Sequence, residues 1–249
     1  MTDQSYVMDC AGIRVRYAFL YRETPSYFGD YLEEDKESEE AIEVRAWPEY
    51  LTKNRWLVGE NRCPEAFLEL QCLMVLTGNR LLPYGRALFH GAALLWKGRA
   101  WILTGPSGVG KTTQLRHWMR LQGKEAHVIN GDKPLLQCRE DGTIWIYSSP
   151  WKGKEGLGIQ GLSAPLGGIV LLEQGMENRM CRLHPEDAVL PLFVEFISWP
   201  EDSGQIRAQA GVLERILKTV PVWELVNLGD RASTMLAQST ISEYLEVVG

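Results

Sequence analysis

Nine consecutive residues near the middle of the chain have the types and spacing of a phosphate-binding loop. They are Gly105, Pro106, Ser107, Gly108, Val109, Gly110, Lys111, Thr112 and Thr113, and the first eight match the pattern GxxxxGK[ST] in full. The glycines allow backbone angles that other residues avoid, so successive N–H groups can point at one anion. Lys111 can neutralise phosphate oxygens, and the Thr112 hydroxyl can ligate Mg²⁺. The sequence therefore predicts a nucleoside triphosphate site, which we expect to take ATP with Mg²⁺.

A carboxylate that could serve this site follows about twenty residues later. The apolar run Ala126–Asn130 is predicted to be a strand, and it leads into Gly131 and Asp132. If that strand lies next to the strand before the loop, Asp132 can reach Mg²⁺ and orient or deprotonate an attacking hydroxyl. The alternative is an ordinary Gly-Asp turn. Lys133 fits a phosphate contact and a solvated turn lysine equally well.

Two further features have the chemistry of a phosphoryl site. The segment 149–156 contains Trp151, Lys152 and Lys154 between glycines, without helical periodicity. Such a segment suits a mobile, anion-binding lid, and the alternative is a surface turn with solvated lysines. His90 is flanked by apolar residues, and chemistry alone favours a hydrogen-bonded core histidine there over a catalytic one.

The hydrophobic pattern predicts the elements that position these residues. Two apolar runs, 92–96 and 100–104, surround a Lys-Gly-Arg turn and predict a hairpin whose second strand enters the loop. A helix is expected from Lys111 to Leu121 after the loop. Further expected elements are strands at 143–147, 168–172 and 220–226 and helices at 203–218 and 230–248. This order predicts an α/β domain over residues 86–249.

The first 85 residues predict a small α+β region packed on that domain. Alternation at 13–17 and 41–46 indicates half-buried strands, and 66–76 is apolar around much of a helix. Between Gly29 and Glu43 there are eight acids and one base. We interpret this stretch as a solvated connection between strands, with an acidic loop for a basic partner as the alternative.

The composition excludes several classes of function. Lys and Arg number 26 against 32 Asp and Glu, and the net charge of −6 argues against nucleic-acid binding. We find no apolar run of membrane-spanning length and no secretory signal pattern, so we expect a cytoplasmic protein without membrane contact. The five cysteines form no CxxC pair, so neither a zinc site nor a disulfide framework is expected.

The order of His90-Gly91, hairpin, glycine-rich loop and Asp132 resembles the HPr kinase/phosphorylase family. It is equally similar to the related small kinases encoded beside ribosomal-peptide maturation genes, whose fold is related to phosphoenolpyruvate carboxykinase. The resemblance covers about a third of the chain, from Leu88 to Glu173, and is weaker in the last sixty residues. It implies a P-loop nucleotide-binding core like the C-terminal domain of HPr kinase. In such kinases the loop binds ATP, a histidine–glycine pair lies near the active site, and two aspartates hold Mg²⁺ and activate an acceptor serine.

Carried over by position, the resemblance assigns catalytic roles to Lys111, His90 and Asp132, with Thr112 and Asp132 at the metal. The first aspartate of the family pair is Gly131 here, which argues against the reverse, phosphorylase reaction. Residues 156–168 lack the acidic–basic signature of enzymes that act on HPr, and residues 1–85 do not resemble their regulatory domain. The chain is therefore more similar to the stand-alone kinases.

The function expected from these observations is an ATP- and Mg²⁺-dependent kinase acting on a serine of a protein or peptide. A small-molecule kinase uses the same loop, because phosphoryl transfer is mainly positioning and charge neutralisation. A P-loop ATPase that drives a partner and a nucleotide-binding module without chemistry are the remaining alternatives. The sequence does not identify the acceptor, and it predicts no oligomeric state.

Overall fold

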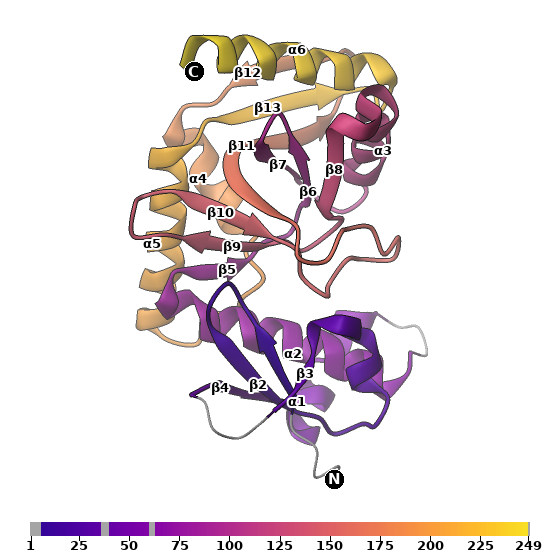
Figure 1. The fold of residues 1–249 in the computed structure, drawn as a ribbon, viewed down its shortest axis with the longest axis vertical. Coiled ribbons are helices and arrows are strands. Elements are labelled where there is room, and N and C mark those ends of the chain that lie inside the picture. The colour runs from indigo at the N-terminus through magenta and orange to yellow at the C-terminus, as the bar shows by residue number, and fades with distance from the viewer. Residues whose placement is uncertain (1–5, 36–39, 60–62, 249) are drawn as a thin grey trace.

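The structure, a computed structural model, describes residues 6–35, 40–59 and 63–248. It has a smaller lobe formed by the N-terminal part of the chain and a larger α/β lobe formed by the rest (Figure 1). The predicted boundary after residue 85 stays a prediction. The two lobes share a hydrophobic cluster. In the described part of the chain, no helix is long and apolar enough to cross a membrane.

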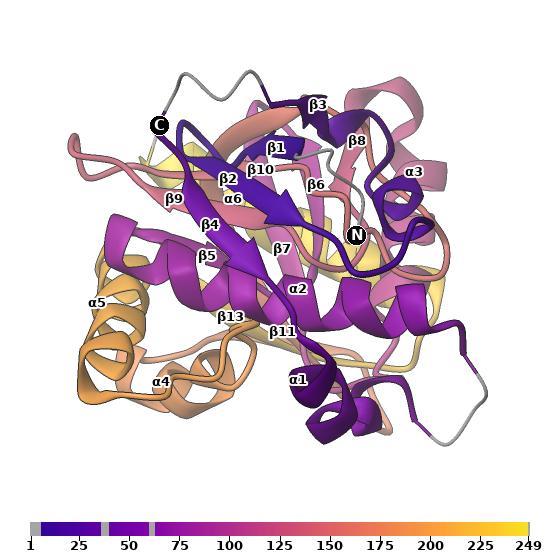
Figure 2. The same ribbon diagram turned by 90° about the horizontal axis from the view of Figure 1, so that it is seen from below.

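The smaller lobe is a sheet covered by one long helix. The strand order is β3 (Glu33–Glu34), β1 (Tyr6–Asp9), β2 (Arg14–Ala18) and β4 (Ile42–Arg45), with β2 and β4 parallel and the other pairs antiparallel. The helix α2 (Glu65–Leu81) lies between this sheet and the larger lobe (Figure 2). Short helices complete the lobe: α1 (Pro48–Lys53) and the 3-10 turns η1 (Thr24–Tyr27), η2 (Gly29–Tyr31) and η3 (Arg55–Val58).

The position of α2 explains its composition. Apolar side chains on opposite sides of the helix are buried, since one side meets the small sheet and the other meets Leu88 and Leu135 of the larger lobe. Gly78 allows the closest approach, because a Cβ there would lie 1.8 Å from the carbonyl oxygen of Ile197. The mostly buried helix predicted over 66–76 is therefore confirmed and extends to Leu81.

The larger lobe is built on a mixed sheet. Its strand order is β5 (Arg86–Leu88), β9 (Leu135–Cys138), β10 (Ile144–Tyr147), β11 (Ser163–Gln174), β7 (Arg99–Thr104), β6 (Ala92–Trp96) and β8 (Ala126–Asn130). The second half of β11 also pairs with β13 (Val222–Asn227), and β13 pairs with β12 (Arg179–Arg182). Helices α3 (Lys111–Gln122) and α6 (Arg231–Val248) pack together with one hydrophobic cluster, while α4 (Pro185–Phe193) and α5 (Ser203–Thr219) pack with another.

The predicted hairpin, the helix after the loop and the strand before Gly131 are confirmed. Two expectations change. The strand β8 is not adjacent to the loop's strand β7, because β6 lies between them and is antiparallel to both. Thus β7 and β8 run in the same direction, and their carboxyl ends still reach the same edge of the sheet. The predicted strand at 168–172 is the second half of the longer β11.

The acidic stretch between Gly29 and Glu43 is partly described. Its first acids lie in η2 and in the edge strand β3, and Glu43 lies in β4. Arg16 on β2 is paired with Asp35 and, at 2.7 Å, with Glu43. Residues 36–39, the middle of the predicted connection, lie outside the described residues.

Candidate active site at the glycine-rich loop

The loop connects β7 to α3 in a conformation that needs its glycines. Gly105, Gly108 and Gly110 have φ of +134°, +84° and +107°, a region that residues with a side chain rarely adopt. A Cβ on Gly105 would also lie 2.8 Å from the carbonyl oxygen of Leu172 on β11. Val109 is buried and fixes the loop to the core under α3. The loop therefore presents its backbone at the N-terminus of α3, where the helix dipole favours an anion.

The side chain of Lys111 folds back over the loop. Its Nζ donates to the carbonyl oxygens of Gly105 at 2.7 Å and Pro106 at 3.2 Å. Burial lowers the pKa of this ammonium below its ordinary value, while the negative charges of Glu195 and Asp132 raise it in part. Lys111 therefore lies within electrostatic reach of two carboxylates.

Asp132 is held in place by the end of β8. The buried Asn130 accepts hydrogen bonds from the backbone N–H groups of Asp132 at 2.9 Å and Lys133 at 2.7 Å. Its amide donates to the carbonyl oxygen of Ser149 at 3.0 Å, which ties the turn to the next segment. The Asp132 carboxylate contacts the ammonium of Lys133. Lys133 is thus the ion partner of Asp132, an arrangement that the turn alone did not predict.

His90 lies between two carboxylates. Its Nδ1 is 2.7 Å from Oε2 of Glu195, and its Nε2 is 3.6 Å from Oδ1 of Asp132. A hydrogen bond from Nδ1 to a carboxylate requires a proton on Nδ1. In a neutral imidazole ring, Nε2 is then the nitrogen without a proton, and it faces Asp132. The histidine predicted near the site is therefore beside Asp132, with a partner that the sequence analysis missed.

Backbone pairing fixes Glu195 opposite His90. The N–H of His90 donates to the carbonyl oxygen of Glu195 at 2.7 Å, and an isolated antiparallel bridge joins Phe89 to Phe196. The hydroxyl of Thr104, the last residue of β7, donates to the carbonyl oxygen of His90 at 2.6 Å. The His90–Glu195 pair is therefore attached to the strand that enters the loop.

The segment 150–158 covers Asp132 from the other side. The Cβ that Gly153 lacks would lie 2.9 Å from Oδ2 of Asp132. Lys152 donates to the carbonyl oxygen of Gly158 at 3.1 Å, and the exposed Lys154 borders the same cavity as Lys111. Trp151 differs from the lid prediction: it is 5% exposed and packs edge-on against Phe28 of the smaller lobe. It anchors the segment, and Lys152 and Lys154 border the site.

Most of the predicted site residues meet at one cavity of about 420 Å³, which we call the loop cavity. Of the others, Gly105, Pro106 and Val109 line a second cavity and Trp151 a third. It is lined by residues of the loop and α3 together with His90, Asp132 and the segment around Gly153. Thr112 and Asp132 contribute a hydroxyl and a carboxylate to it, oxygen donors of the kind Mg²⁺ takes when substrate phosphates and water complete its shell. Among the described residues, no three His, Cys, Asp or Glu side chains form a metal cluster. The two protein oxygens of Thr112 and Asp132 thus fit a metal ion whose remaining ligands are phosphate oxygens and water.

A larger cavity of about 850 Å³ lies on the other side of the loop, and we call it the apolar cavity. It shares only Ser107 and Gly108 of the loop with the loop cavity. Leucines of β11 and residues of α4 form its apolar wall, and carboxylates are added by Glu173, Asp187, Glu195 and Glu224. Apolar walls with a few carboxylates match the needs of a base and a ribose.

Comparison with known proteins adds little to this geometry. No family model matches the chain, and no curated protein matches it. Among solved structures, the chain is similar to the Hpr(Ser) kinase/phosphatase from Coxiella burnetii, with 10% identity over 65% of this chain and 99% of that chain and a TM-score of 0.35. A likeness at that level leaves the function to be argued from the site itself.

Proposed function

We propose that this protein is an ATP- and Mg²⁺-dependent kinase that phosphorylates a serine hydroxyl of a protein or peptide. The observation that carries the proposal is the convergence on one cavity of the glycine-rich loop, Lys111, Thr112 and Asp132 with its neighbour His90. The loop and Lys111 are needed to bind an anion. Thr112, Asp132 and His90 are needed to bind the metal and to transfer a proton. This set exceeds what a simple anion-binding turn requires.

The chemical step assigns a task to each group. The acceptor oxygen forms a bond to the γ-phosphorus while the bond from that phosphorus to the β–γ bridging oxygen breaks, and ADP leaves with the electron pair. The hydroxyl proton passes to Asp132 or to Nε2 of His90, 3.6 Å from it. Lys111 and the loop N–H groups offset the phosphate charge. Bound Mg²⁺ would offset the negative charge of the phosphates, and Thr112 and Asp132 would be its protein donors.

The apolar cavity indicates which way round the nucleotide binds in this proposal. If the base and ribose occupy that cavity, the phosphates cross the loop at Ser107 and Gly108 and end beside Lys111. The γ-phosphate then lies on the side of Asp132 and His90. A site that binds only an inorganic anion does not require an adjoining apolar cavity of this size.

The first experiment is transfer of labelled γ-phosphate from ATP·Mg²⁺ into a lysate of the source organism. Lys111→Ala and Asp132→Asn run beside the wild type, with the exposed Lys124→Ala as a matched control. We expect label on a discrete protein or peptide band that is lost in the two site variants and kept in the control. Label confined to a small molecule would indicate a metabolite kinase, free phosphate alone an ATPase, and ATP binding without turnover a binding module.

A further inference from the structure

A cavity of about 520 Å³ lies between the two lobes and opens on Asp132; we call it the inter-lobe cavity. Its walls are mostly apolar and come from both lobes: Tyr27, Phe67 and Met74 from the smaller lobe, and Trp151 from the larger. Asp132, Lys152, Gly153 and Lys154 line both this cavity and the loop cavity. The two spaces are therefore neighbours across the candidate catalytic carboxylate.

The loop cavity adjoins both of the other cavities. The apolar cavity touches the loop cavity at Ser107 and Gly108, and the inter-lobe cavity touches it at Asp132 and Gly153. Among the described residues, the apolar and inter-lobe cavities have no lining residue in common. Phosphoryl transfer places the attacking and leaving oxygens roughly in line on opposite sides of the phosphorus. With the nucleoside in the apolar cavity, the acceptor belongs in the inter-lobe cavity, which adjoins the loop cavity at Asp132.

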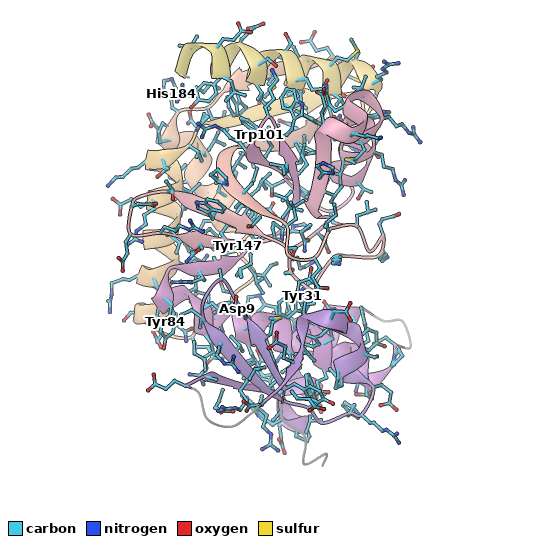
Figure 3. All side chains as sticks on the ribbon, viewed as in Figure 1. Asp9, Tyr31, Tyr84, Trp101, Tyr147 and His184 are labelled. Atoms are coloured by element: carbon cyan, nitrogen blue, oxygen red, sulfur yellow. The ribbon has the colours of Figure 1, made fainter. Side chains whose placement is uncertain are left out.

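The inter-lobe cavity continues as a groove along the smaller lobe. A further hollow of about 400 Å³ shares Tyr27, Pro150, Lys152 and Gly153 with it and follows the chain from Ser26 to Tyr31. Tyr31 lies on the edge of the smaller lobe that faces the larger one (Figure 3), where the Lys152 ammonium lies 5.2 Å from the centre of its ring. An elongated groove of this kind suits an extended chain better than a compact molecule.

The wall of the groove is fixed by a buried carboxylate. Glu69 of α2 accepts hydrogen bonds from the backbone N–H groups of Leu20 at 2.6 Å and Tyr21 at 3.2 Å and from the hydroxyl of Thr24 at 2.5 Å. These contacts hold the turn that leads into η1, and the ring of Tyr27 in η1 packs edge-on against Phe67 of α2 at 5.8 Å. The groove is therefore preformed on its smaller-lobe side.

We propose that this inter-lobe groove is the acceptor site and that it takes an extended peptide with a large apolar residue beside its serine. The serine hydroxyl lies at Asp132, the apolar side chain enters the inter-lobe cavity beside Tyr27 and Phe67, and the chain continues toward Tyr31. The inference rests on the proposed kinase function and adds the groove that binds the peptide and the apolar residue that it prefers beside the serine. The occupant follows from the apolar walls, the length of the groove and its continuity with the candidate site.

Serine-centred peptide libraries with labelled ATP·Mg²⁺ test this assignment. In each library one neighbouring position is fixed as Leu or Phe, or as Gln or Asp, and small aliphatic alcohols form a separate arm. We expect wild type to prefer an apolar residue at one position next to the serine. Burying such a side chain is worth about 1.5–3 kcal/mol, so kcat/KM is expected to differ by roughly 10- to 150-fold between apolar and polar peptides.

Wall variants separate the groove from the nucleotide site. Tyr27→Ala removes a partly exposed ring from the wall, Phe67→Ala removes its neighbour, and Tyr84→Ala is the matched control because Tyr84 is exposed on a different surface. We expect the first two to reduce the preference for apolar peptides about 10-fold or more by raising the peptide KM, with an unchanged KM for ATP. Tyr84→Ala is expected to behave as wild type.

The outcomes distinguish the two proposals. Equal use of apolar and polar peptides, transfer to alcohols alone, or wall variants with unchanged peptide KM would overturn the acceptor assignment and leave the kinase function standing. Absence of transfer to any acceptor, with Lys111→Ala indistinguishable from wild type, would overturn the kinase function and the acceptor assignment with it.

Discussion

At the scale of single residues, the candidate site depends on Glu195. It comes from the chain just after α4, 105 positions from His90, and no motif marks it. Its negative charge acts on Lys111 together with that of Asp132. Its contact with Nδ1 of His90 gives it the position of an orienting residue.

Replacing Glu195 tests that role. In Glu195→Gln the negative charge is lost while an acceptor for Nδ1 remains, and in Glu195→Ala both are lost. We expect kcat for phosphoryl transfer to fall on the order of 10-fold in the first and further in the second, with the KM for ATP little changed. A positioning role is expected to lower kcat with unchanged unfolding in urea, whereas a purely structural role would lower the stability as well. The exposed Glu201→Gln is the control.

Gly131 leads to a prediction about packing beside Asp132. A Cβ there would lie 3.0 Å from Cβ of Leu157 and 3.2 Å from the carbonyl oxygen of Lys152. The segment 150–158 fills the space of a side chain, so Gly131→Asp is expected to lower both activity and stability rather than to restore an acid. We expect Gly131→Ala alone to cost about 1–3 kcal/mol in chemical denaturation.

Gly211 in α5 provides the matched control for this substitution. A Cβ at that position would meet nothing within 4 Å, so Gly211→Ala is expected to leave the fold unchanged or stabilise it by about 0.5–1 kcal/mol. A Gly131→Asp variant with higher kcat and unchanged unfolding would contradict the packing argument.

At the scale of elements, the sequence predicted what lies near the loop and missed what pairs with it from afar. The hairpin β6–β7, the helix α3 and the strand β8 follow from local turn chemistry and periodicity. Short or irregular elements gave too weak a pattern: β5 has three residues, and α4 contains Pro191. The bridge that places Glu195 beside His90 is a long-range contact, and periodicity carries no information about such contacts.

The helix α2 carries a buried carboxyl group, Glu69, whose pKa is raised. Burial raises the pKa of Glu69 above its ordinary value of 4.5, and hydrogen bonds from Leu20, Thr24 and Tyr21 offset this only in part. The folded state therefore holds the proton more tightly than the unfolded chain does. The stability that Glu69 contributes is fully present below about pH 4.5 and is lost as the pH rises through the raised pKa.

Glu69→Gln removes this titration. We expect its free energy of unfolding to improve relative to wild type as the pH is raised from about 4 to 7. Urea denaturation across that range measures the difference, with the exposed Glu49→Gln as a control that is expected to show no such trend. Glu69→Ala is expected to cost about 1–3 kcal/mol at pH 7, because it leaves three donors without their acceptor. A constant difference between Glu69→Gln and wild type would contradict the assigned pKa direction.

At the scale of the whole molecule, the two lobes form one hydrophobic unit around α2. Leu88, Leu135 and Trp151 of the larger lobe belong to the same buried cluster as Tyr17 and Phe28 of the smaller one. The proposed acceptor groove lies along this junction, so its geometry depends on the lobes staying docked.

Hydrogen exchange measured by mass spectrometry tests this cooperativity. Phe28→Ala opens a cavity at the junction and Leu115→Ala opens one in the core under α3, each at a cost of roughly 2–5 kcal/mol. If the lobes unfold together, each variant lowers the protection of the slowest amides in β2 and in β8 by the same free energy, wherever its cavity lies. Loss of protection confined to the smaller lobe in Phe28→Ala, and to the larger lobe in Leu115→Ala, would show two units. The junction would then be a hinge, and an acceptor bound there would have to close the groove rather than enter a preformed one.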